Sequence, residues 1–533
     1  MLTHSTINLV LIRSAIFCLQ CAPLVEAILL FPLLYGTISN HKPISPPLII
    51  LASLLALEAA YYLAFYRPHK ARLLTTKATH PSPSLTRSQR QALFDKCAAN
   101  IPDFEFYIRG WFLNAPLSEI HRDNVREFLL WAFFDHDHDD NSTPLSPESE
   151  SQINSLITQC ETLLNQKFPP GRGPPTTRSL RLTIDPIQTR YRSVLWFFII
   201  TLTDAITHLH LQYLGNFTYH APSNSPQSSF PPRLSHLPWV GQKPSSAKSA
   251  SYYLRPHPPG SSNLPVVFLH GIGIGLWPYR SFLSSLAPTS GVLALELLPI
   301  SSRLTSPLLS KPQFQSELTH IISTLGWDKT GFVLVTHSYG SVLATHLIHS
   351  PAISPCIKGI VLVDPVTILL HLPAVAYNFT RRQPKKANEH QLHYFASTDL
   401  GIAEGLGRYF FWRENIIWKE ELLSSERKVA VALAGKDLIV DTKSVARYLA
   451  GEGKDGLREV VQSGDYDETK SLFEESGEGG SSSHSTRSGI EILWFPKLDH
   501  AQAFESQKDM ESVLDVVRRF CLVSQGGETR KTM

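Results

Sequence analysis

A serine lies at an abrupt change of hydrophobic pattern in this 533-residue sequence, and its surroundings suit a nucleophile. Residues 332–335 (Phe-Val-Leu-Val) form a short apolar run that is typical of a buried parallel strand. From Ser341 onward, apolar residues recur at helical spacing. Ser338 therefore falls at a strand-to-helix turn, a geometry that lifts a serine hydroxyl above the edge of a sheet. Gly340 meets the demand of this turn for a small residue, whereas Thr336 stands where a glycine is usual.

A serine hydroxyl attacks a carbonyl poorly unless a base removes its proton, and the base is usually a histidine held by a carboxylate. The sequence after Ser338 offers both groups. Asp437 comes just past one strand-like run, and His500 lies in the loop after the last such run. Two other carboxylates are alternative acids: Asp441, four residues further on, and Asp364, which ends the preceding strand. The order along the chain is thus serine, acid, histidine.

A glycine-rich turn, His270-Gly271-Ile272-Gly273, follows an earlier strand-like run. Such a turn can aim a backbone N–H at the oxyanion that develops when a serine attacks a carbonyl, together with the N–H of Tyr339. For His270 we expect a hydrogen bond within this turn rather than a role in catalysis.

Together these pieces resemble the α/β-hydrolase superfamily, in its serine-nucleophile branch, over roughly residues 250–523. The resemblance implies a mainly parallel sheet flanked by helices, with residues 365–427 as a lid, and it implies chemistry that needs no metal and no organic cofactor. Residues 86–214 are similar to upstream segments of fungal membrane-anchored members. The roles that the resemblance implies are Ser338 as nucleophile, His500 as base, Asp437 as orienting acid, and Ile272 and Tyr339 as oxyanion donors.

The elements that must position these residues alternate between strand and helix from about residue 250, which indicates a mainly parallel sheet covered by helices. Two interruptions break the alternation: the aromatic-rich lid region, residues 365–427, and residues 451–488, which are charged and then Gly/Ser-rich and are predicted to be a disordered insertion. The candidate strands are Tyr252–Arg255, Val266–Leu269, Val292–Leu297, Phe332–Val335, Gly359–Val363, Val429–Leu433 and Ile492–Phe495.

Two apolar segments near the start of the chain, residues 14–38 and 48–66, are long enough to cross a bilayer. Pro23 and Glu26 weaken the prediction for the first segment, because a carboxylate at mid-bilayer costs about 2.5–3.5 kcal/mol on insertion scales. The second segment contains Glu58. Basic residues follow the second segment, so the positive-inside rule favours a hairpin anchor with the catalytic domain in the cytosol. Residues 1–80 are therefore predicted to be a membrane-anchor hairpin with a basic flank.

The region between the anchor and the sheet, residues 81–248, is predicted to be helical with Pro/Ser-rich linkers, and residues 249–533 are predicted to form the hydrolase domain. Residues 191–214 are apolar but are interrupted by Asp204 and His208, so a buried or interfacial helix is favoured over a membrane span. The cluster Asp135–Asp140 is interpreted as a solvated acidic loop rather than a metal site.

The bulk composition fits a globular protein with a membrane portion, since 43% of the residues are hydrophobic and 18% are charged. The formal net charge of +3 is too small to argue for a nucleic-acid partner. The favoured hypothesis is a serine esterase or lipase-like enzyme that acts on a hydrophobic or lipid-like ester. An acyltransferase that uses the same triad and a non-catalytic membrane scaffold are the alternatives.

Overall fold

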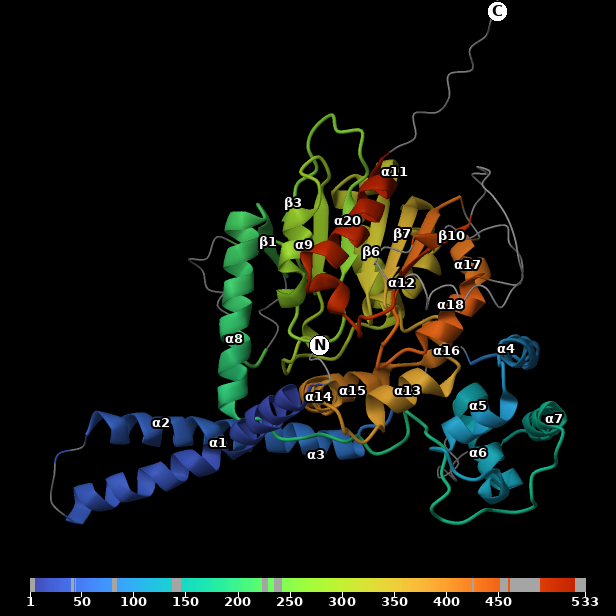
Figure 1. Cartoon of the computed structure of the whole chain (residues 1–533), viewed down its shortest axis with the longest axis horizontal. Coiled ribbons are helices and arrows are strands. Elements are labelled where there is room, and N and C mark those ends of the chain that lie inside the picture. Colours follow the sequence, from blue (N-terminus) through green and yellow to red (C-terminus); the bar gives the residue numbers. More distant parts are fainter. Residues whose placement is uncertain are drawn as a thin grey trace, which may run out of the picture.

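A mostly parallel sheet forms the centre of the computed structural model (Figure 1). The structure describes residues 5–39, 43, 45–78, 84–136, 145–222, 229–233, 242–423, 426–450, 459–460 and 489–522. Within them the strand order is β2-β1-β3-β5-β4-β6-β7-β8-β10-β9. β3 runs antiparallel to both of its neighbours, and the other pairs are parallel. The strands are β1 (Thr218–Ala221), β2 (Lys243–Pro244), β3 (Ser251–Arg255), β4 (Val266–Leu269), β5 (Val292–Glu296), β6 (Phe332–His337), β7 (Ile357–Val363), β8 (Lys428–Ala434), β9 (Glu459–Val460) and β10 (Ile490–Phe495).

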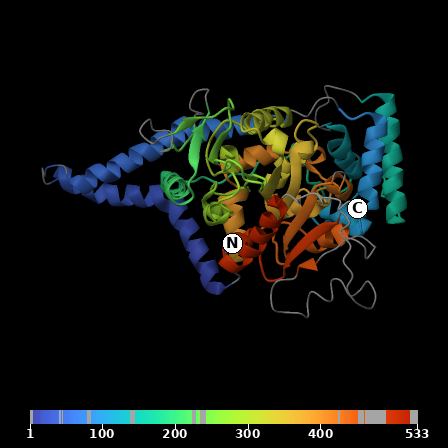
Figure 2. The same ribbon diagram turned by 90° about the horizontal axis from the view of Figure 1, so that it is seen from above.

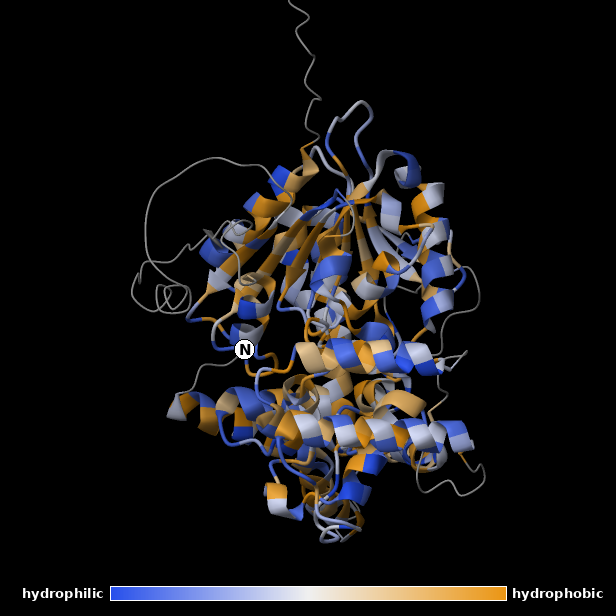
Figure 3. Cartoon of the chain, turned by 90° about the vertical axis from the view of Figure 1, so that its right-hand side faces the viewer, coloured by the Kyte–Doolittle hydropathy of each residue, from blue (hydrophilic) through white to orange (hydrophobic). Residues whose placement is uncertain are grey.

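All seven predicted strands form, and β1, β2 and β9 are additional. The central strands are buried on both faces and read as continuous apolar runs, which Figure 3 shows in orange. In β4, for example, Val267 and Leu269 belong to one hydrophobic core and Val266 and Phe268 to the other. The first core includes residues of α10 (Lys311–Thr324), α12 (Gly340–Ile348) and α18 (Thr442–Ala450); the second includes residues of α9 (Arg280–Ser285) and α20 (Gln507–Cys521).

The lid region, residues 365–427, is helical and lies between the sheet and the N-terminal helices (Figure 1). Two tryptophan side chains join it to those helices: Trp111 Nε1–H donates to the carbonyl of His371 over 3.2 Å, and Trp412 Nε1–H donates to that of Ala132 over 3.1 Å. The lid-region helices are α13 (Pro373–Thr380), α14 (Ala387–Leu392), α15 (Leu400–Tyr409), α16 (Trp412–Asn415) and α17 (Lys419–Leu423); the helices that pack beyond them are α4 (Arg87–Ala99), α5 (Phe104–Trp111), α6 (Arg122–Phe134) and α7 (Pro147–Leu164).

The first predicted anchor segment lies within α1 (Thr6–Ser39), and the second begins in α2 (Pro46–Tyr61) and ends with the π turn that follows it. The two helices project together from the body (Figures 1 and 2). Both helices are long and apolar enough to cross a membrane, when α2 is taken with its continuation through a π turn (Tyr62–Tyr66) into α3 (Arg67–Thr75). A third helix meets the same criterion, α8 (Val194–Leu209) with its π turn (His210–Leu214). The cytosolic orientation stays a prediction.

The basic flank after the anchor contacts the lid region directly. On α3, Arg72 donates to Glu404 of α15 over 2.7 Å, and His69 Nε2 lies 2.7 Å from the same carboxylate. Part of the flank is therefore bound to protein rather than to lipid.

Two predicted features lie largely outside the described residues. The predicted disordered insertion, residues 451–488, is described only at β9. Of the acidic cluster, only Asp135 and His136 are described, and the Asp135 carboxylate pairs with Arg413 of the lid region.

Candidate active site

The turn that carries Ser338 joins β6 to α12 without an intervening loop. Ser338 has φ +50°, a left-handed conformation that is uncommon for a residue other than glycine. The turn is held from both sides, because the Ser338 N–H donates to the carbonyl of Val363 over 2.9 Å and the N–H of Ser341 donates to the Ser338 carbonyl over 2.9 Å. A strained backbone that is so fixed is typical of a functional turn.

Two glycines let the turn approach the neighbouring strand closely. A Cβ added at Gly340 would lie 2.2 Å from the carbonyl oxygen of Leu269, and one added at Gly271 would lie 2.8 Å from Cβ of Ser338. Thr336, which stands where a glycine is usual, is completely buried within β6. The turn therefore forms around Thr336, and the steric demand for glycine falls two residues after Ser338, at Gly340, rather than two residues before it.

We expect Gly340→Ala to destabilise the protein by about 1–3 kcal/mol or more, because overpacked sites force backbone shifts of that cost. Denaturant unfolding of the detergent-solubilised full chain measures this effect. The matched control is Gly405→Ala on α15, where the new Cβ would lie 3.4 Å from Leu308, an ordinary contact. Equal unfolding midpoints for both variants would contradict the assigned close approach.

The structure brings Ser338, His500 and Asp437 into one hydrogen-bonded chain. His500 Nε2 lies 2.8 Å from Ser338 Oγ, and His500 Nδ1 lies 2.7 Å from Asp437 Oδ2. The other oxygen of Asp437 accepts the backbone N–H groups of Ile439 and Val440 over 2.7 and 2.9 Å. With Nδ1–H donating to the carboxylate, Nε2 is left as an acceptor for the serine hydroxyl. The three residues follow β6, β8 and β10, whose carboxyl ends lie at one edge of the sheet.

The two alternative acids have different positions. Asp441 begins α18, where its carboxylate accepts the N–H of Ser444 over 3.2 Å, and it makes no contact with His500 among the described residues. Asp364 is buried behind the site and accepts the N–H groups of Ala434 and Ala501, each over 2.9 Å. Ala434 lies three residues before Asp437, and Ala501 directly follows His500. Asp364 therefore holds both the loop of Asp437 and the loop of His500 in place.

Asp364, Asp437 and His500 also bring potential metal-ligand atoms within 4.8 Å of one another. The hydrogen bonds described above already use those atoms, both carboxylate oxygens of Asp364 included. The arrangement therefore suits proton transfer at His500 without a further ligand.

Two residues that sequence reasoning missed hold the loop of His500. The buried carboxylate of Asp499 accepts the N–H of Leu438 over 2.9 Å and that of His500 over 2.8 Å. Its other oxygen accepts the side-chain amide of Asn388, which comes from α14 of the lid region. Asp499 could have been suspected because it precedes His500, but nothing in the sequence marks Asn388.

The predicted oxyanion donors, Ile272 and Tyr339, line the same pocket as Ser338. Within the described chain, neither backbone N–H donates to another residue. His270 makes the expected local hydrogen bonds: its Nδ1 lies 2.8 Å from the carbonyl of Gly271, and its Nε2 accepts the N–H of Leu297 over 2.9 Å. The turn therefore leaves both candidate N–H groups available to an oxyanion.

The pocket at Ser338 is apolar and has a volume of about 660 Å³, including the space open to solvent. Its walls come from the sheet domain, from the lid region, and from the N-terminal helices with the segment that follows them. The apolar residues from the last two sources are Trp111, Trp131, Leu182, Val366, Leu370, Val375, Ala376, Phe379, Leu406, Phe410 and Trp412. Residues far apart in the sequence thus enclose one apolar site.

The electrostatics of the site favour a charged histidine. Burial alone would lower the pKa of His500, but the carboxylates of Asp437 and Asp364 outweigh it and raise the pKa to about 9. For Asp364, burial and then the negative charge of Asp437 raise the pKa. Below the pKa of His500 the imidazolium is favoured, and the neutral form, in which Nε2 accepts the serine proton, gains as the pH rises.

If His500 is the base, kcat/KM for an ester should rise with pH up to about 9, since each pH unit below the pKa lowers the neutral fraction about tenfold. A pH–rate profile of the full chain measures this. Asp441→Asn is the matched control and should leave the profile unchanged, because Asp441 is exposed and makes no contact with His500 among the described residues. A plateau that begins below pH 6.5, the ordinary histidine pKa, would contradict the arrangement.

Comparison with known proteins places this geometry in context. The model of a family described as the alpha/beta hydrolase family matches residues 266–460, a span that begins with β4 and includes Ser338 and Asp437. No curated protein matches the sequence.

Several solved structures are similar to parts of the chain. They include a membrane phospholipase A described as a bacterial virulence factor, with 12% identity, 61% of this chain and 94% of that chain covered, and a TM-score of 0.34. Naproxen esterase from Bacillus subtilis has 13% identity and a TM-score of 0.34, and the match covers 61% of this chain and 98% of the esterase. A putative aryl esterase from Burkholderia cenocepacia has 15% identity and a TM-score of 0.31, and the match covers 51% of this chain and 96% of the esterase.

Proposed function

We propose that this chain, which belongs to the α/β-hydrolase superfamily, is a serine hydrolase that cleaves a carboxylic ester through an acyl-enzyme. The observation that carries the proposal is the chain of hydrogen bonds from Asp437 through His500 to Ser338, beside an apolar pocket. An activated serine next to two available backbone N–H groups is the arrangement that acyl transfer requires.

In the proposed reaction, Ser338 Oγ attacks the acyl carbonyl while His500 Nε2 accepts the hydroxyl proton. Asp437 keeps Nδ1 protonated and stabilises the imidazolium. The N–H groups of Ile272 and Tyr339 bind the oxyanion, where the loss of one donor costs about 2.7–4 kcal/mol. His500 then protonates the departing alkoxide, which leaves an ester at Ser338. Water, deprotonated by the same imidazole, releases the acid and restores the serine.

The proposed substrate is a hydrophobic or lipid-like ester. The support is the apolar pocket, in which bulky side chains of the lid region and the N-terminal helices surround the position of the acyl chain. The helices α1 and α2, which are long and apolar enough to cross a membrane, support a location where such esters concentrate. An apolar pocket of this kind binds a hydrocarbon chain by removing its surface from water.

The test is hydrolysis of p-nitrophenyl esters by the detergent-solubilised full chain, with the acyl products separated in the presence and absence of an added alcohol. Release of free acid in both conditions supports the hydrolase. Transfer of the acyl group to the alcohol in preference to water indicates an acyltransferase and overturns the assigned reaction. No turnover of any chain length indicates a non-catalytic scaffold.

Ala376→Trp should shorten the acyl chains that the enzyme accepts, because Ala376 lines the pocket from α13. We expect kcat/KM for long-chain esters to fall by about 10–200-fold, the range for a poorly fitting apolar group, with little change for acetyl esters. The chain-length profile of the same assay measures this. Ala374→Trp, on the same helix but not in the pocket lining, is the matched control. An equal loss at every chain length would contradict the assigned acyl pocket.

A further inference from the structure

Helix α8 and its π turn carry an outward stripe of large apolar side chains. The stripe recurs every three or four residues, as one face of a helix does. All of residues 194–214 are described, and none of their exposed side chains is charged. The stripe residues are Leu195, Phe198, Ile199, Leu202, Ile206, Leu209, Tyr213 and Leu214, all of them more than a third exposed. An apolar face of this length is uncommon on a surface that meets only water.

The threonine hydroxyls of α8 need no water. Thr201 donates to the carbonyl of Phe197 over 2.9 Å, and Thr207 donates to that of Thr203 over 2.7 Å. Thr203 bonds in the same way to the carbonyls of Ile199 and Ile200. A helix that satisfies its polar groups internally is compatible with an apolar environment.

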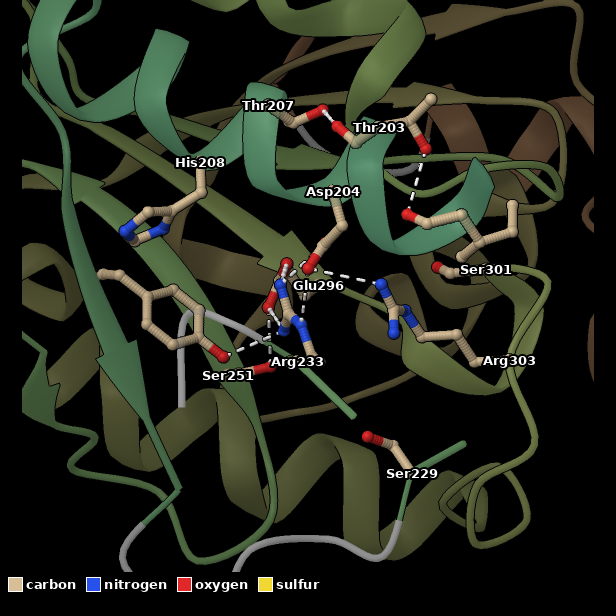
Figure 4. Close-up of polar contacts among 12 residues, drawn as sticks. Thr203, Asp204, Thr207, His208, Ser229, Arg233, Ser251, Glu296, Ser301 and Arg303 are labelled. Carbon is tan, nitrogen blue, oxygen red and sulfur yellow. Dashed lines mark hydrogen bonds and ion pairs between the residues drawn. The ribbon is translucent and has the colours of Figure 1, made fainter. Parts of the chain in front are cut away.

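The opposite face of α8 is fixed to the sheet domain by buried charges (Figure 4). Asp204 points from α8 toward Arg233 and Arg303 and pairs with them over 3.0 and 3.2 Å. Arg233 also pairs with Glu296 at the end of β5 over 2.5 Å, and its side chain is completely buried. His208 Nδ1 lies 3.0 Å from the hydroxyl of Tyr253. The two residues that interrupt the apolar pattern therefore face the protein body.

The start of α8 is tied to the membrane helix α2. The buried carboxylate of Glu58 on α2 accepts the N–H of Val194 over 2.8 Å and the hydroxyl of Tyr191. Tyr61, the last residue of α2, lies 5.1 Å from Phe197 between ring centroids. Aromatic residues at the end of a membrane helix are typical of the membrane–water interface. α8 therefore begins where the hairpin leaves the body.

The directions of the helices decide how α8 meets a bilayer. The hairpin of α1 and α2 projects sideways from the body in Figure 1, whereas α8 stands nearly perpendicular to it along the same flank. Figure 2 shows α8 almost end-on, at the side from which the hairpin projects. A bilayer crossed by the hairpin would thus run along α8.

We propose that α8 and its π turn lie in the plane of the bilayer surface that α1 and α2 enter, with the apolar stripe in the headgroup and upper acyl region. The helix is a second, interfacial membrane contact. Its occupant is lipid because the stripe continues the apolar surface of the hairpin, contains no charge and belongs to a helix whose threonines are satisfied internally. Since 21 residues span roughly 31 Å at 1.5 Å each, this contact fixes the tilt of the domain on the membrane.

The experiment measures the depth of α8 in phosphatidylcholine vesicles that contain the full chain. Cys18, Cys21 and Cys356 are accessible and are replaced by alanine, whereas the other three cysteines are buried. Single cysteines are then introduced as Phe198→Cys, Leu202→Cys, Ile206→Cys or Leu209→Cys, and each is labelled with nitrobenzoxadiazole. Quenching is compared between lipids with a doxyl group near the headgroup and lipids with one near the chain end. Thermal unfolding confirms that each variant is folded.

We expect stronger quenching by the shallow doxyl group than by the deep one at all four positions. The matched control is Leu163→Cys on α7, an exposed leucine on the opposite side of the molecule, which should not be quenched. Depth that changes steadily from position 198 to position 209 would show a spanning helix and overturn the proposal. Absence of quenching at all four positions would show that water, a second copy or another segment of this chain covers the stripe, and would overturn it too.

Discussion

In the Ser338→Ala variant, we expect kcat for ester hydrolysis to fall by about 10⁶-fold, because loss of the nucleophile in a serine triad has an effect of that size. A residual rate above that of water would remain, since the oxyanion donors and the pocket are untouched. The measurement is a single-turnover assay of the full chain.

The matched control for this variant is Ser323→Ala, an exposed serine on α10 that does not line the pocket, and it should keep full activity. The two variants are compared by thermal unfolding, because alanine at φ +50° could also weaken the turn. A folded Ser338→Ala enzyme with undiminished activity would contradict the role of this serine.

For Asp437→Asn, we expect kcat to fall by about 10⁴-fold. The asparagine amide would donate to His500 Nδ1, and this favours the tautomer whose Nε2 carries the proton and cannot accept the one from Ser338. Asp437 is the proposed acid because its Oδ2 lies 2.7 Å from Nδ1 of His500, while two backbone N–H groups donate to its other oxygen. The assay is the one used for Ser338→Ala.

The comparison variant for the acid is Asp364→Asn. In the native protein the Asp364 carboxylate accepts the N–H groups of Ala434 and Ala501 and does not contact Nδ1 of His500. Its loss should therefore lower the stability of the fold more than it lowers kcat. If Asp364→Asn were folded and inactive while Asp437→Asn kept its rate, the acid would have to be reassigned.

The sequence was informative where a short segment determines its own structure. Each predicted strand is a run of apolar residues that the sheet buries on both faces, so the pattern located it within two residues. The turn at Ser338 could be predicted because a strand pattern gives way to a helix pattern within a few residues. β2 and β9 were missed because two residues carry too little pattern, and β1 was missed because its sequence, Thr-Tyr-His-Ala, is not an apolar run.

Contacts between distant segments could not be predicted. The amide of Asn388 meets Asp499 across 111 positions, and Asp364 supports two loops with no local signal of either bond. Trp111 and Trp131 pack in the core of the N-terminal helices, and they also line the pocket at Ser338. A sequence pattern reports that a tryptophan is buried, but not which cavity it encloses.

The charged residues of the apolar helices illustrate the same limit. Glu58 lies in the second predicted anchor segment, and a carboxylate in lipid is costly, but this carboxylate accepts a backbone N–H of α8. Asp204 likewise pairs with two arginines that lie 29 and 99 positions away. The composition of a helix gives its total polarity, whereas the fold decides which side meets lipid.

The central claim is that His500 activates the Ser338 hydroxyl for attack, and covalent labelling with a fluorophosphonate probe tests it most directly. After reaction of the full chain in detergent, peptide mass spectrometry locates the adduct. The account predicts a phosphonylated Ser338 in the native protein and at least a thousandfold slower labelling in His500→Ala, consistent with the loss of a triad base. An unmodified Ser338 in the folded native protein, or equal labelling rates with and without the imidazole, would contradict it.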